Sequence, residues 1–158
     1  MSEGMKLAEE LFSEITGVKA RNVELGHGSF ITMDFGKDVL ITSKKTMRTR
    51  RRGEWFLWIY MCAWRLDHKG QPVVGASDSR DFIESKLPHL EGKKFLHMKI
   101  TSNSFDCRLE FDENWTLLLF SHGVQEDEQW MFFTSHNGKV FTAGPGISWE
   151  YEDSSKPQ

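Results

Sequence analysis

The residues with the strongest chemical character in this chain form one short basic run, KKTMRTRRR at positions 44–52. Six of its nine positions are Lys or Arg. Because the guanidinium group is a planar fork of donors, several Arg in one surface loop can hold carboxylate or phosphate oxygens. The candidate partner-binding residues of this run are Arg48, Arg50, Arg51 and Arg52.

A second charged segment, Glu126, Asp127 and Glu128, lies toward the other end of the chain. Three adjacent acids form either a solvated loop or a docking patch for a basic protein surface. Residues 110–158 carry a net charge of −7 and the remaining residues +4, which leaves −3 for the whole chain. This separation of charge fits a solvated or self-paired basic loop, or a protein partner, better than it fits nucleic acid. A homodimer is also compatible with it.

Residue types found in catalytic and metal sites are present, but without the spacing that their chemistry needs. None of the six His lies four residues from another, and none has a Cys at zinc spacing. Asp34 and Glu110 each precede a Phe and a turn, as an outward-facing strand residue does. The chain has no GxSxG, Walker or GxGxxG motif. We therefore expect no enzyme activity, no cofactor and no metal.

Two helices and a series of strands are expected to position these residues. Apolar residues at helical spacing predict an amphipathic helix over about residues 3–16, with Ser2 as its N-cap and Gly17 as its stop. A weaker pattern predicts a second helix over 79–87. Runs typical of strands occupy 21–25, 29–35, 39–42, 55–66, 95–101, 105–111, 115–120, 130–134, 140–142 and 147–151.

The run Trp55–Trp64 consists of ten consecutive apolar residues. Both alternating sets of side chains are apolar, whereas a half-buried strand alternates polar and apolar residues. The pattern predicts one central strand over 55–66 that is covered on both faces. The basic run before it is then a surface loop, residues 43–53.

The expected elements repeat at an offset of about 75 residues. Residues 28–30 match 103–105, and 33–35 match 109–111; the third match joins 54–56 to 129–131. We predict an α+β fold, a mainly antiparallel β sheet or split barrel with two helices, in which an α-β-β-β-β unit is a candidate pseudo-duplication. The expected organisation is a single α+β domain over residues 1–151, a candidate internal repeat over 3–66 and 78–134, and a flexible tail over 152–158.

The cellular location follows from the cysteines and the apolar segments. Cys62 and Cys107 both lie in apolar strand patterns and are expected to be reduced core residues. Residues 1–17 mix acids among apolar residues, unlike a signal peptide, and ten apolar residues are too few for a membrane-spanning helix. We expect a cytoplasmic protein that does not enter the membrane.

The strand pattern of residues 25–150 resembles that of a class of small bacterial proteins. The segments that carry the resemblance are GSFITMDFG, RGEWFLWIYMCAWRL, LEGKKFLHMKI, DCRLEFDENWTLLLF and QWMFFTSHNGKVFTAGPG. These proteins are uncharacterised or immunity-like, and some accompany polymorphic or contact-dependent toxins. The resemblance implies a non-catalytic protein that binds a cognate toxin through variable surface loops, and it transfers no functional residue to this chain.

Three functions are compatible with these observations. The first is a cytosolic protein-binding module of the immunity type, which neutralises a bacterial toxin through the Arg residues of the basic run and the acids at 126–128. The second is a nucleic-acid-binding domain that uses the Arg-rich loop 44–52. The third is a carrier of an apolar small ligand, because an aromatic-rich barrel can enclose one.

Overall fold

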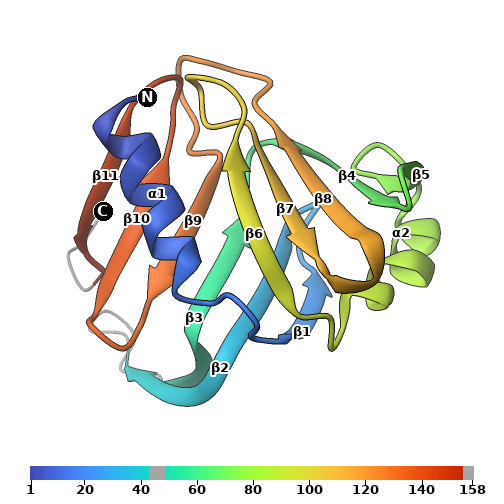
Figure 1. Ribbon diagram of the computed structural model, residues 1–158, viewed down its shortest axis with the longest axis horizontal. Helices are drawn as coiled ribbons and strands as arrows, with labels where there is room; N and C mark the ends of the chain where they lie inside the picture. The colour runs from blue at the N-terminus through green and yellow to red at the C-terminus, as the bar shows by residue number, and fades with distance from the viewer. Residues whose placement is uncertain (43–48, 155–158) are drawn as a thin grey trace.

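The computed structural model describes residues 1–42 and 49–154. Within these residues, eleven strands form two antiparallel sheets that face each other across one core (Figure 1). The six-stranded sheet has the order β1 (Ala20–Leu25), β2 (Ile31–Thr42), β3 (Thr49–Ile59), β9 (Trp130–Thr134), β10 (Lys139–Ala143), β11 (Trp149–Asp153). The five-stranded sheet has the order β5 (Gln71–Gly75), β4 (Ala63–His68), β8 (Trp115–Phe120), β7 (Cys107–Phe111), β6 (Phe95–Ile100). The predicted class, α+β with mainly antiparallel sheet, is confirmed.

The helices lie at opposite sides of the two sheets (Figure 1). Helix α1 (Glu3–Ser13) begins at Ser2, whose Oγ accepts a hydrogen bond from the Met5 N–H at 3.2 Å. The Phe12 ring of this helix stacks on Phe132 of β9, with 4.0 Å between the ring centroids. Helix α2 (Arg80–Lys86) continues into a 3-10 turn, η1 (Leu87–Leu90), and packs near β5. A second 3-10 turn, η2 (Asp112–Asn114), joins β7 to β8.

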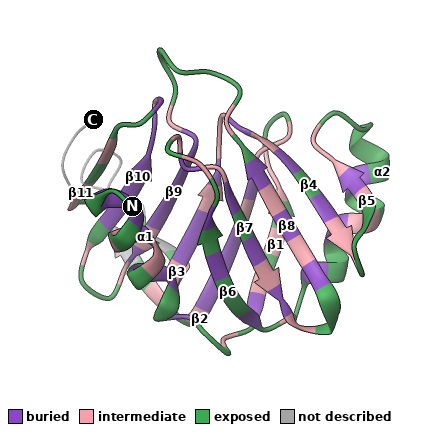
Figure 2. Cartoon of the chain, turned by 45° about the horizontal axis from the view of Figure 1, so that its top comes forward, coloured by how far each residue is buried: buried purple, intermediate pink, exposed green. Residues whose placement is uncertain are grey.

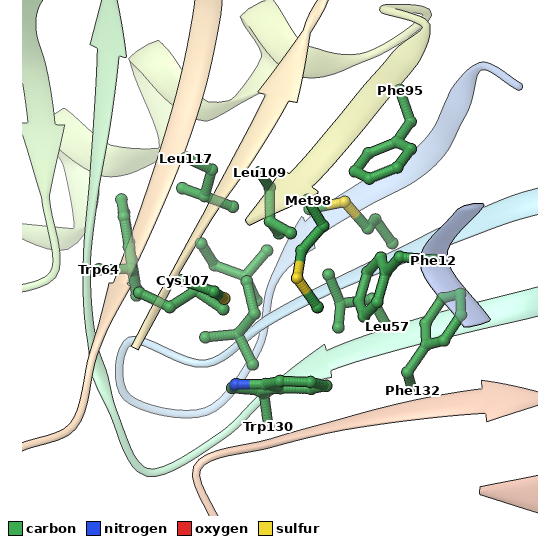
Figure 3. Packing of buried hydrophobic residues seen from close by; sticks show 14 of the residues in the cluster. Phe12, Leu57, Trp64, Phe95, Met98, Cys107, Leu109, Leu117, Trp130 and Phe132 are labelled. Carbon is green, nitrogen blue, oxygen red and sulfur yellow. The ribbon is translucent and has the colours of Figure 1, made fainter. Parts of the chain in front are cut away.

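The core is the space between the sheets, and both sheets contribute to it. Buried residues concentrate on the strands, while α2 and the loops are largely exposed (Figure 2). Figure 3 shows Leu57 of β3 and Leu117 of β8 in the same cluster with Trp130. The Trp130 ring lies 5.7 Å from Phe12 and 5.5 Å from Phe141, centroid to centroid. Side chains of both sheets and of α1 therefore fill the interior around Trp130.

The single central strand predicted over 55–66 is wrong. Strand β3 ends at Ile59, and the chain then crosses to the other sheet, where β4 begins at Ala63. Leu57 and Ile59 face the core from β3, whereas Trp64 faces it from β4, so the core-facing residues of the run come from both alternating sets. Within β3, Phe56 and Trp58 lie on the outer face of the six-stranded sheet.

The surface loop predicted over 43–53 is also wrong at its C-terminal end. Residues from Thr49 onward belong to β3 and pair with β2, and Thr49 itself pairs with Thr42. The strand runs predicted over 29–35 and 39–42 belong to the one strand β2, and the break between them is a β-bulge, because the pairing shifts between Phe35 and Asp38 while the strand continues. Residues 43–48 of the predicted loop lie outside the described residues.

Two smaller differences concern strand ends. Strand β5 pairs with β4 although no strand is predicted there, and its Pro72 is accommodated on an edge of the sheet. Strand β11 includes Glu152 and Asp153, two residues that the sequence places in the tail, because they pair with Val140 and Lys139. Ser154, the next residue of the predicted tail, donates its N–H to the Gly138 carbonyl at 2.8 Å, and residues 155–158 lie outside the described residues.

The two sheets are built by an equivalent path of the chain. Strands β1–β3 form a meander that pairs through β3 with β9, and β6–β8 form a meander that pairs through β8 with β4. Lys19 and Lys94, just before the first strand of each meander, form an antiparallel bridge with each other. Such a contact between equivalent residues defines a pseudo-two-fold axis.

The backbone hydrogen bonds at this bridge obey the same relation. The Phe95 N–H donates to the Val18 carbonyl at 2.9 Å, and the Ala20 N–H donates to the Lys93 carbonyl at 2.8 Å. Val18 and Lys93 are separated by the same offset as the bridging lysines, and so are Ala20 and Phe95. Each bond is therefore the counterpart of the other.

Two buried tryptophans repeat this relation in the core. The Trp64 indole N–H, in β4, donates to the Ser29 carbonyl at 2.7 Å, and the Trp130 indole N–H, in β9, donates to the Phe105 carbonyl at 3.1 Å. Each acceptor lies in the loop that precedes the second strand of its meander. The predicted match of 54–56 to 129–131 differs from this topology, since β9 corresponds to β4. Duplication as the origin of the two halves stays a prediction.

Candidate ligand-binding site

The outer face of the six-stranded sheet carries a groove of about 780 Å³. Strands β1, β2, β3 and β9 form its floor, and the β1–β2 loop and the residues after β9 and β11 form its rim. Its apolar lining comes from Phe30, Leu40, Phe56, Trp58 and Phe133. Its polar lining comes from Glu24, His27, Thr32, Arg52, Ser135 and Ser154.

The β2–β3 hairpin bends toward its far end (Figure 1), and Leu40 and Arg52 from that part of the hairpin line the groove. At the bend, Gly53 has no room for a side chain, since a Cβ would lie 2.6 Å from the Phe35 carbonyl oxygen. The Asp34 carboxylate accepts hydrogen bonds from the Gly53 N–H and from the Asn22 side-chain amide, each at 2.9 Å. Asp34 is only 1% exposed, so this carboxylate serves to hold the bend and cannot reach a ligand.

Arg52 is placed in the groove by this bend. Its guanidinium carbon lies 4.5 Å from the centroid of the Phe56 ring, within the range of a cation–π interaction. Arg52 therefore adds a cation to the apolar lining. Leu40, on the facing strand of the hairpin, is 69% exposed beside it.

The five-stranded sheet provides an internal comparison for the groove. On the six-stranded sheet, Asp34, Phe56 and Phe133 are cross-strand neighbours on the outer face. Their counterparts on the five-stranded sheet are Glu110, Thr116 and Asp67. There the charges pair locally, Arg65 with Asp67 at 2.7 Å and Arg108 with Glu110 at 3.3 Å. The fold thus tolerates a polar outer face, so the aromatic lining of the groove is not required by the architecture.

The Arg residues predicted to bind a partner are placed unequally. Arg52 lines the groove, while Arg51 is exposed and does not belong to its lining. The backbone of Arg50 pairs with Ile41 in the hairpin, but its side chain lies outside the described residues. Arg48 also lies outside them.

The predicted acidic residues lie in the loop between β8 and β9. Glu126 and Asp127 are exposed, and the carbonyl of the half-buried Glu128 accepts a hydrogen bond from the Met61 N–H at 3.3 Å. This contact fixes the loop near the C-terminal end of β3, whereas Arg52 lies toward its N-terminal end. The structure therefore does not bring Arg51 or Arg52 together with the acids at 126–128.

A second acidic group lies on the outer face of β11. The pKa of the Glu150 carboxyl is raised by the nearby Glu152 carboxylate, by a hydrogen bond with it and, to a smaller extent, by Glu128. Repulsion among these acids makes this edge of the sheet favourable for a cation. Among the described residues, no group of three His, Cys, Asp or Glu could hold a metal ion.

Sequence reasoning missed most of the groove. The signal that could have revealed it is the apolar set of the run 55–64 that includes Phe56 and Trp58, which the sequence pattern places on a buried face. Phe30, Phe133 and Ser135 carry no comparable signal, because only the pairing of distant strands brings them to Trp58.

Compared with known proteins, the chain matches no protein family, no curated protein and no solved structure. The resemblance to immunity-like proteins therefore stays a prediction. In the part of the chain that the structure describes, no helix has the length and apolar character needed to cross a membrane.

Proposed function

We propose that this protein is a non-catalytic binding protein that holds a small, largely apolar ligand in the groove of its six-stranded sheet. The observation that carries the proposal is the pair Phe56 and Phe133 on the floor of the groove, whose equivalents in the five-stranded sheet are the polar Thr116 and Asp67. Its volume of about 780 Å³ lies within the range of small-molecule sites. Such a carrier acts by binding alone, and we place it in the cytoplasm, where its two buried thiols would stay reduced.

The floor of the groove is suited to a flat ring system. Phe56 and Phe133 are neighbours, with ring centroids 5.6 Å apart, and Trp58 is the next outward residue along β3. Trp58 and Phe133 are only half-buried in the free protein. A ligand that covers them gains roughly 25 cal/mol for each Å² of apolar surface removed from water.

Phenylnaphthylamine, a neutral fluorescent probe, tests this proposal. We expect it to bind the wild type, and the variants Trp58→Ser and Phe133→Ser each to raise its Kd by about tenfold, because each removes ring contact area worth roughly 1.4 kcal/mol. Fluorescence titration measures the effect. The matched control is Leu96→Ser, which removes a 46% exposed apolar side chain from the outer part of the other sheet. A wild type that does not bind the probe, or a control that loses binding equally, contradicts the assignment.

The immunity-type function is a second candidate, and a separate surface favours it. Val124, in the same loop as the acids, is 70% exposed, and Ile147 is 75% exposed. The two loops adjoin, since a Cβ on Gly146 would lie 3.2 Å from the Val124 carbonyl oxygen. Exposed apolar residues beside Glu126 and Asp127 suit the basic surface of a protein partner such as a toxin domain.

The second candidate predicts a salt-sensitive protein complex. In a tagged pull-down from the source cell, one stoichiometric protein should bind the wild type, and the double variant Glu126→Lys with Asp127→Lys should lose most of it. The captured protein should be toxic when expressed alone. Equal capture by both forms removes the acids from the interface. Nucleic acid that dissociates as salt is raised would instead assign the function to the basic run.

A further inference from the structure

We propose that the ligand of the groove is an amphiphilic acid, an apolar or aromatic body with one anionic group that pairs with Arg52 and Ser135. This inference rests on the proposed ligand-binding function and names the chemical class of the ligand. Two independent features of the groove carry it: among residues 1–42 and 49–154, Arg52 has no ion-pair partner and the buried Ser135 hydroxyl has no hydrogen-bond partner.

The charge of Arg52 is the first feature. Four other arginines have carboxylate partners, as in the pairs Arg21 with Asp38, Arg65 with Asp67, Arg80 with Glu84 and Arg108 with Glu110. No carboxylate of the described residues forms an ion pair with Arg52. Its contact is the Phe56 ring, which leaves the edge of the guanidinium and its donors for another group. A half-buried cation in an apolar groove attracts an anion more strongly than an exposed one does.

The hydroxyl of Ser135 is the second feature. Its Oγ is buried and has no hydrogen-bond partner among the described residues, although it lines the groove. A buried hydroxyl left unsatisfied is unfavourable, so it indicates an acceptor that arrives with the ligand. The Ser135 N–H donates to the Glu54 carbonyl at 2.8 Å, which places Ser135 beside the segment of β3 that carries Arg52. The two donors therefore lie at the same end of the groove.

The charges at the other positions orient the ligand. Glu24 and His27 line the opposite end, near Phe30 and the β1–β2 loop, and a carboxylate there disfavours an anion. Glu152 of β11 pairs with Val140 of β10, which pairs with Phe133 of β9, so the Glu152 carboxylate lies two strands away from the aromatic floor of the groove. The acid group is thus placed at Arg52 and Ser135, while the apolar body extends over Phe56 and Trp58.

Two probes that share one ring system test the inference. Anilinonaphthalene sulfonate carries an anion that phenylnaphthylamine lacks, so their Kd values isolate the contribution of the charge. In low salt we expect the sulfonate to bind the wild type about tenfold more tightly than the neutral probe. Arg52→Gln should abolish this preference, so that the variant binds the sulfonate and the neutral probe with Kd values equal within about twofold. Arg51→Gln, which removes the same charge one residue away, is the matched control and should keep the preference.

Ser135→Ala supplies a readout that a structural role would not give. Because the hydroxyl makes no hydrogen bond within the described residues, the variant should keep or slightly raise the urea midpoint of the wild type while binding the sulfonate a few-fold more weakly. Equal Kd values of the two probes on the wild type, or equal effects of the Arg51 and Arg52 variants, overturn the acid class and leave the groove intact as a ligand site. A wild type that binds neither probe overturns the proposed function itself.

Discussion

Replacing Gly53 with Ala should destabilise the protein by about 3 kcal/mol and abolish binding in the groove. A Cβ at this position would lie 2.6 Å from the Phe35 carbonyl oxygen and 2.8 Å from the Trp55 carbonyl oxygen. Both are backbone atoms of the hairpin itself, so no side chain can rotate to make room. Relief requires the strands to separate at the bend, which breaks the hydrogen bond from Gly53 to Asp34 and moves Arg52 away from Phe56.

Urea denaturation gives the free energy of unfolding, and titration with the neutral probe gives the Kd of the same sample. The matched control is Gly123→Ala, because a Cβ there meets no atom within 4 Å. Gly123→Ala should match the wild type in both measurements. If Gly53→Ala is as stable as the wild type and binds the probe equally, the bend does not form the groove.

Local sequence signals were sufficient for the helices and the fold class. Ser2 caps α1 as expected, and Ser79 caps α2, because an N-cap depends only on residues three or four positions away. Turn residues and alternating apolar residues located most strands for the same reason. These features belong to the chain near each residue and need no knowledge of its distant partners.

The groove depends on contacts that a linear pattern does not contain. An apolar run such as 55–64 has the same periodicity whether its second face is buried or lines a groove. The run of Arg at 50–52 indicates a loop, yet these residues lie in a strand because Val39 and Leu40 pair with Arg52 and Arg51. Neither the burial of Asp34 nor the crowding at Gly53 is visible before β2 and β3 are paired.

The pseudo-symmetry separates what the fold requires from what the function requires. Trp64 and Trp130 occupy equivalent places in the core, each bonded to a loop carbonyl of its own half. Their neighbours on the outer faces have no such likeness, since Phe133 corresponds to Asp67. Packing constrains the core positions of both halves in the same way, whereas the outer positions differ, and the outer face of the six-stranded sheet is the one that carries the aromatic groove.

The two buried cysteines should make the free energy of unfolding depend on pH. Burial and, to a smaller extent, the Asp106 carboxylate together raise the pKa of the Cys62 thiol from its ordinary value of 9.0 to about 12. Burial also raises the pKa of Cys107 well above 9.0, with smaller contributions from Cys62 and Asp106. Both thiols thus stay protonated in the folded protein at pH values where the unfolded chain has lost these protons.

Stability should therefore fall as the pH rises above about 9, by roughly 1.4 kcal/mol per pH unit for each thiol. Below pH 9 both states hold the Cys62 proton and this contribution is fully present; above about 12 the folded state loses it too and the decline ends. Between pH 9 and 11, Cys62 alone should remove about 2 kcal/mol, and Cys107 acts in the same direction. Urea denaturation at pH 8, 9, 10 and 11 measures the slope. The control is the double variant Cys62→Ala with Cys107→Ala, which keeps every Lys and Tyr and should therefore retain only their part of the slope. If its slope equals that of the wild type, the thiols titrate alike in the folded and unfolded states.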